Sequence, residues 1–97
     1  MKDYFLEVLK SIPSQIETGS FFYAIADVKQ NKEHEYHYLI IRKRKGKKVI
    51  DKTEIFLTHE GSKVKLIYFF AEKKFKPLID HIKHYLEILG YDVTRPG

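Results

Sequence analysis

Residues 35–58, EYHYLIIRKRKGKKVIDKTEIFLT, contain two runs of strand-forming residues separated by Gly46. β-Branched and aromatic residues favour strands, and a glycine between two such runs favours a tight turn. The sequence therefore predicts a long β-hairpin built from residues 35–44 and 48–58. Six basic side chains would cluster at its tip: Arg42, Lys43, Arg44, Lys45, Lys47 and Lys48.

Two further strand-forming runs flank this hairpin. Residues 20–28 (SFFYAIADV) precede the hairpin and are joined to it through a polar turn at residues 29–33 (KQNKE). Residues 63–71 (KVKLIYFFA) follow the hairpin after a turn at residues 59–62 (HEGS). Consecutive strands joined by short connections usually pair as neighbours. We therefore expect a four-stranded antiparallel β-sheet arranged as a meander.

Both ends of the chain have helical periodicity. In residues 1–12 the apolar side chains recur at helical spacing, Asp3 is the expected N-cap, and Pro13 interrupts the helix. Residues 74–89 form a longer amphipathic helix, in which Pro77 suits the first turn and Gly90 a left-handed C-cap.

Residues 1–97 are thus predicted to form a single compact α+β domain. It combines the four-stranded antiparallel sheet with an N-terminal helix and a long C-terminal helix. Residues 91–94 (YDVT) would add a short final edge strand.

Side chains alternate between the two faces of a strand, so the sequence also predicts which residues share a face. One set is almost wholly apolar and is expected to meet the helices: Phe22, Ala24, Ala26, Val28, Leu39, Ile41, Ile55, Leu57, Val64, Leu66, Tyr68 and Phe70. The other set mixes aromatic rings with cations: Phe21, Tyr23, Ile25, Tyr36, Tyr38, Ile40, Arg42, Arg44, Lys52, Phe56, Lys63, Lys65, Ile67 and Phe69.

The position of the helices decides what this second face does. Two helices on the apolar face would leave the aromatic and cationic face open, whereas one helix on each face would bury its rings as core. The sequence leaves both arrangements open. Tyr36 and Tyr38 are the better candidates for exposure, because their hydroxyl groups can remain in water.

The charge of the chain is concentrated in its middle third. The net charge of the whole chain is +5, and residues 36–65 alone hold nine basic and three acidic side chains. Such clustering indicates a polyanionic partner, most often nucleic acid. Cations neutralise phosphates, while aromatic rings stack on the bases of single strands.

We therefore predict a small nucleic-acid-binding protein, with single-stranded DNA or RNA favoured over duplex. A duplex would instead receive the hairpin as a two-stranded ribbon in its major groove. The residues expected to contact phosphates or bases are Arg42, Lys43, Arg44, Lys45, Lys47, Lys48, Tyr36, Tyr38, Lys52 and Lys65.

Two other classes of function remain as alternatives. A protein-interaction module, such as a small viral or regulatory inhibitor, would dock the basic hairpin on an acidic protein surface. A metal-dependent nuclease would need carboxylates and a lysine, for which Asp51, Glu72 and Lys74 are the candidates. His81 and His84 with Asp80 are too few for a zinc site, so no enzyme, metal or cofactor is expected.

The remaining composition bears on where the protein acts. The chain has no cysteine, its N-terminal residues are too charged for a signal peptide, and no apolar run is long enough to span a membrane. We expect a cytoplasmic protein. Abundant Lys, Glu and Ile are typical of heat-adapted proteins and suggest an archaeal or viral source. The small size favours a homodimer.

Overall fold

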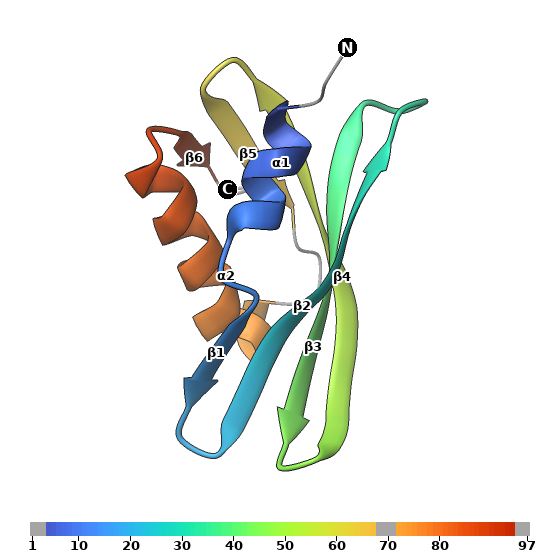
Figure 1. Cartoon of the computed structure of the whole chain (residues 1–97), viewed down its shortest axis with the longest axis vertical. Helices are drawn as coiled ribbons and strands as arrows, with labels where there is room; N and C mark the ends of the chain where they lie inside the picture. The colour runs from blue at the N-terminus through green and yellow to red at the C-terminus, as the bar shows by residue number, and fades with distance from the viewer. Residues whose placement is uncertain (1–3, 68–71, 95–97) are drawn as a thin grey trace.

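The computed structural model describes residues 4–67 and 72–94, which form one curled six-stranded sheet and two helices (Figure 1). The elements are α1 (Tyr4–Ser11), β1 (Gln15–Thr18), β2 (Phe21–Asn31), β3 (Tyr36–Lys45), β4 (Lys48–Glu60), β5 (Lys63–Ile67), α2 (Glu72–Ile88) and β6 (Asp92–Thr94). The strands lie in the sheet in chain order, and among these described strands only the β5–β6 pair is parallel. The predicted α+β class is confirmed.

The predicted number of strands is wrong, because the sheet has six strands and not four. The additional strand β1 lies between Pro13 and Gly19 and has Ile16 as its one apolar residue, so its sequence resembles a loop. The final edge strand is present as β6. It runs parallel to β5 because α2 returns the chain to the same end of the sheet, as parallel pairing requires.

The ends of α2 follow the sequence signals. The helix is kinked at Phe75, whose φ of −121° and ψ of 17° are not helical, and Pro77 lies in the first turn after this kink. At the other end Gly90 adopts a φ of 98°. The amide of Gly90 donates to the carbonyl of Glu87 (3.0 Å), and that of Tyr91 to Leu86 (3.1 Å), which is a Schellman cap. The predicted N-cap of the first helix, Asp3, lies outside the described residues.

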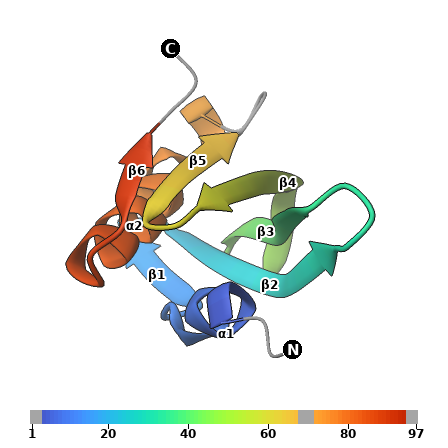
Figure 2. The same cartoon turned by 90° about the horizontal axis from the view of Figure 1, so that it is seen from above.

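Both helices pack on the same face of the sheet, here called the inner face. The Phe5 ring of α1 stacks on His59 (4.2 Å between centroids), and Phe75 of α2 meets Tyr23 edge to face (6.1 Å). Seen from above, the strands follow a curve (Figure 2). The buried core contains Phe5, Leu9, Ile12, Tyr23, Ile25, Leu39, Ile41, Ile55, Leu57, Val64, Leu66, Phe75, Leu78, Ile79, Ile82, Leu86 and Val93.

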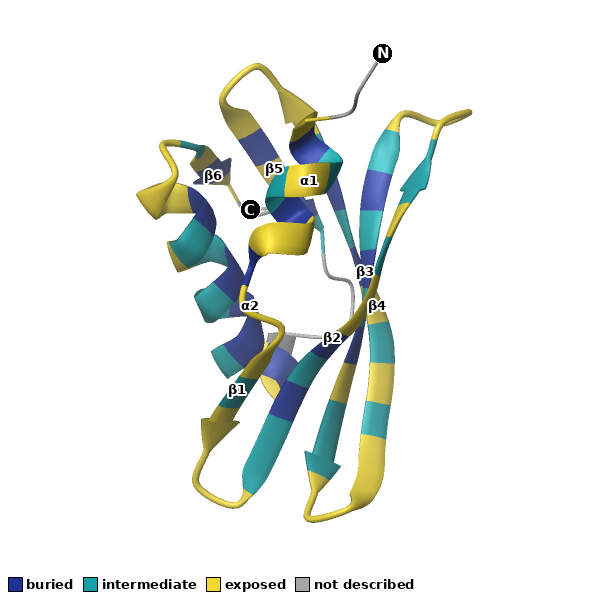
Figure 3. Cartoon of the chain, viewed as in Figure 1, coloured by how far each residue is buried: buried dark blue, intermediate teal, exposed yellow. Residues whose placement is uncertain are grey.

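The opposite face, here called the outer face, keeps its side chains half-buried or exposed. Figure 3 shows the contrast along β3 and β4, where buried residues alternate with more exposed ones. In the described part of the chain, no helix combines the length and apolar character needed to cross a membrane.

A β-bulge in β2 reverses part of the predicted face assignment. Ala26 is an extra residue between the pairs Ile25↔Ile41 and Asp27↔Ile40, so simple alternation fails there. Tyr23 and Ile25 are therefore buried on the inner face. Phe21 also lies there, whereas Phe22 and Ala24 lie on the outer face. The predicted face members Tyr68, Phe69 and Phe70 lie outside the described residues.

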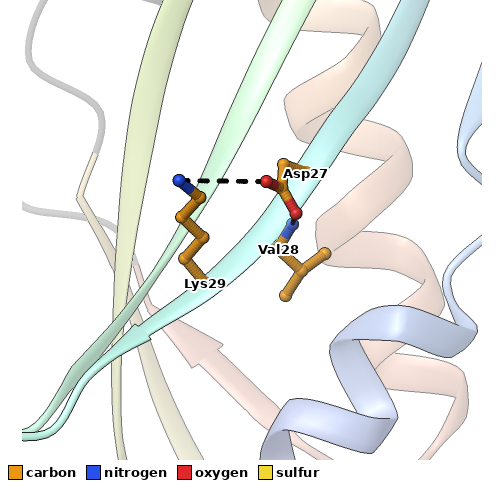
Figure 4. A network of polar contacts seen from close by, with 3 residues as sticks. All are labelled: Asp27, Val28 and Lys29. Atoms are coloured by element: carbon orange, nitrogen blue, oxygen red, sulfur yellow. Dashed lines mark hydrogen bonds and ion pairs between the residues drawn. The ribbon is translucent and has the colours of Figure 1, made fainter.

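The chain after the bulge is held by Asp27 (Figure 4). One carboxylate oxygen of Asp27 accepts a hydrogen bond from the amide of Val28 (2.8 Å), and the other lies 4.0 Å from the ammonium group of Lys29. Val28 then faces Leu39 on the inner side, as predicted. A local side-chain contact of this kind can satisfy a backbone amide at a bulge, where the regular ladder of hydrogen bonds is interrupted.

Candidate functional site

The basic hairpin does not project from the sheet. One row of paired residues runs across the first four strands: Thr18 of β1, Phe21 of β2, Lys45 of β3 and Lys48 of β4. The turns that join β1 to β2 and β3 to β4 therefore lie at the same end of the molecule, as Figure 1 shows. The hairpin tip is thus the edge of a surface four strands wide.

The six hairpin cations are divided between the two faces of the sheet. Arg42 and Arg44 lie on the outer face, in register with Ala24 and Phe22 of β2. The guanidinium carbon of Arg44 is 4.9 Å from the centre of the Phe22 ring. Together with Lys47 these arginines line a hollow of about 270 Å³, the cationic depression, whose other lining residues are Gln15, Phe22, Ala24 and Val49.

The charge of this depression has one sign, since no carboxylate is among its described lining residues. Lys52 adds a further cation beside it, because it pairs with Arg42 across β3 and β4. Arg42, Lys47 and Lys52 are exposed to solvent. The outer face thus offers several accessible cations at one end of the sheet.

The other three hairpin lysines, Lys43, Lys45 and Lys48, lie on the inner side. The ammonium group of Lys43 is 4.2 Å from the ring centre of Phe21, a distance at which cation and ring attract each other. Lys45 and Lys48 face each other at the edge and are exposed. The predicted cluster of six is therefore two groups of three.

A second hollow on the outer face, the aromatic depression, has a volume of about 310 Å³ and is lined by His34, Tyr36, Phe56, Thr58 and Ile67. The Tyr36 ring meets Phe56 edge to face at 5.5 Å between centroids. Tyr38 adjoins both rings, at 6.1 Å from each. The predicted pair Tyr36 and Tyr38 is thus half-buried within a larger aromatic cluster.

The two depressions lie on the same face, separated along β3. Tyr38 and Arg42 are four residues apart, which corresponds to about 13 Å along a strand. Between them runs the row Asp27, Ile40 and Glu54, whose two carboxylates are exposed. Lys65 pairs with Thr58 and so adjoins the aromatic depression. Each depression therefore has a cation beside it.

The residues considered for catalysis or metal binding have other contacts. The carboxylate of Asp51 lies 3.3 Å from the ammonium group of Lys74, and the side chain of Glu72 lies outside the described residues. His81 contacts the carbonyl of Pro13 through Nε2 (3.1 Å), and Asp80 pairs with Lys76 (2.7 Å). Across residues 4–67 and 72–94, no three metal-ligating side chains gather into a group.

Sequence reasoning did not select several residues that line the two depressions. Alternation predicts the correct face for Phe56 and Ile67 but does not mark them as site residues. Gln15 belongs to the strand that the sequence did not reveal, and the bulge moved Phe22 to the outer face. Of these residues, only Phe56 and Ile67 carried a signal, which is their alternation with buried neighbours.

Comparison with known proteins adds no family to these observations. No family model, curated protein or solved structure matches the chain. The geometry of the outer face is therefore the basis for a functional proposal.

Proposed function

We propose that the outer face binds single-stranded nucleic acid. The observation that carries this proposal is that both helices pack on the inner face, so the rings and cations of the outer face remain accessible. Single strands are held by such a combination of aromatic stacking and phosphate neutralisation. The phosphate contacts are assigned to Arg42, Arg44, Lys47, Lys52 and Lys65, and the base contacts to Tyr36 and Tyr38.

The width of the sheet favours a single strand over insertion into a duplex. Four strands end together at the cationic end, so their axes span three spacings of about 4.8 Å, or about 14 Å. The major groove of B-DNA is about 12 Å wide and admits a two-stranded ribbon. The tip is too wide for that mode, whereas an open face can receive an unpaired strand.

The test of this proposal is a fluorescence-anisotropy titration with labelled single-stranded DNA, duplex DNA and single-stranded RNA of equal length. We expect single strands to bind more tightly than duplex. Five phosphate contacts give a slope of log K against log salt of about −3.5, or about a 100-fold loss between 50 and 200 mM salt. Tighter binding to duplex, or an affinity that does not change between 50 and 200 mM salt, would contradict the proposal.

A second candidate is the docking of the hairpin on an acidic protein surface. It is favoured by Val49 and Ile50, which are 46% and 41% exposed beside the cations of the tip. Ile50 is the extra residue of a bulge between the pairs Lys43↔Asp51 and Arg44↔Val49. An absence of saturable binding to all three nucleic acids at low salt would leave this candidate in place of the first.

A further inference from the structure

The turn between β2 and β3, residues 32–35, borders the aromatic depression in an unusual conformation. Glu35 has a φ of 55°, which is the left-handed region that residues other than glycine rarely occupy. Such conformations persist where surrounding contacts fix them, and they often accompany binding sites. The contacts that fix this turn therefore bear on what the aromatic depression binds.

Asn31, the last residue of β2, ties this turn to the rim of the depression. Its side-chain oxygen accepts a hydrogen bond from the amide of His34 (3.0 Å). Its side-chain nitrogen donates to the hydroxyl of Tyr36 (3.3 Å). One amide group thus fixes both the turn and the ring that follows it.

The result is a pair of nearly parallel rings at the depression. The His34 and Tyr36 rings are inclined by 14°, with 6.4 Å between centroids, and His34 is exposed. Phe56 and Ile67 complete the apolar lining, and Thr58 adds a hydroxyl group. This set of groups suits a flat aromatic ligand with polar atoms on its edge.

The size of the depression points to a small ligand. Its volume of about 310 Å³ is at the lower end of the range for small-molecule sites, which is about 300–1,000 Å³. Lys65 adjoins it through its pairing with Thr58, so an anionic group next to the ligand would meet a cation. A base attached to a sugar–phosphate chain meets both requirements.

We infer that the aromatic depression holds one unstacked nucleobase, with His34 as a direct contact and Asn31 as the residue that positions it. This inference rests on the proposed binding of single strands and specifies where a base is held. The apolar side chain of a protein partner is the alternative occupant. The cations on the same face favour the base, because they complement the phosphates on either side of it.

The test compares two labelled ligands of equal length, oligothymidylate and the same sugar–phosphate chain without bases. Wild-type protein is expected to prefer oligothymidylate by about 5- to 150-fold for one stacked base. His34→Ala should reduce this preference, and Asn31→Ala should reduce it less. Arg42→Ala is the matched control and should weaken both ligands equally. Melting curves would show that each variant is folded.

The outcomes separate this inference from the proposal on which it rests. If both ligands bind with equal, salt-dependent affinity, the aromatic depression does not hold a base, and an apolar side chain of a protein partner becomes its expected occupant. Phosphate binding by the outer face would still be supported. An equal loss on both ligands in His34→Ala would also overturn the inferred base site. Binding of neither ligand by the wild type would overturn the proposed function itself.

Discussion

Replacing Arg42, Arg44 and Lys47 together by alanine is expected to weaken binding to single-stranded DNA by about 500-fold at 50 mM salt and about 30-fold at 200 mM. Each cation that neutralises a phosphate of a single strand contributes about 0.7 to the slope of log K against log salt. Removing three contacts should therefore lower the steepness of that slope by about 2. Anisotropy titrations over this salt range measure both quantities.

The matched control removes the same charge from the other face. Lys43, Lys45 and Lys48 lie on the inner side of the same hairpin, so their triple alanine variant has the same net charge as the outer variant. Exposed charges are screened beyond about 10 Å at 0.1 M salt, and the inner variant should lose much less affinity. Equal losses would show that total charge, and not the outer face, governs binding.

Replacing Leu39 by alanine is expected to lower the free energy of unfolding by about 2–5 kcal/mol. Leu39 has no exposed surface and lies in the core that both helices share. A domain of this size has a stability of about 5–15 kcal/mol, so the loss would be a large fraction of it. Urea or thermal denaturation followed by circular dichroism gives the value.

The neighbouring residue provides the control for this substitution. Ile40 lies on the outer face of the same strand and is half-buried. Since strand positions of this kind change stability by about 1 kcal/mol, Ile40→Ala should cost far less than Leu39→Ala. Comparable losses for the two variants would mean that the outer face is also covered, and the proposed interface would be withdrawn.

The hairpin, both helices and the α+β class were predictable because each depends on local patterns. The central strands are long and contain β-branched and aromatic residues, and Pro77 and Gly90 delimit the regular part of α2 as expected. Along β3 no residue is inserted between Tyr36 and Lys45, so alternation placed Tyr36, Tyr38, Arg42 and Arg44 on one face correctly.

Other features depend on contacts between distant residues and left no clear local signal. The strand β1 is stabilised by pairing with β2 and not by its own composition. The bulge at Ala26 is a single inserted residue within a long strand, yet every side chain of β2 that precedes it lies on the face opposite to the predicted one. The place of Phe22 and Gln15 in the cationic depression follows from these two features.

The contacts at the β2–β3 turn, beside the aromatic depression, could likewise not be predicted from local sequence patterns. The sequence marked residues 29–33 as a polar turn, whereas β2 continues to Asn31 and the turn follows it. The two hydrogen bonds of Asn31 and the left-handed conformation of Glu35 depend on the folded geometry of the turn, and no residue pattern in the sequence indicates them. His34 is not among the residues that the sequence predicts for the site, and its stacking on Tyr36 becomes visible only in the folded chain.

The most direct test of the outer face is to identify the residues that a bound single strand touches. Ultraviolet cross-linking of oligothymidylate to the protein, followed by mass spectrometry, reports the aromatic side chains next to the bases. Binding at the outer face predicts cross-links at Tyr36, Tyr38 and Phe56. Cross-links confined to Tyr4, Tyr85 or Tyr91, which belong to the helices or the segment after α2, would place the nucleic acid elsewhere and contradict the proposed interface.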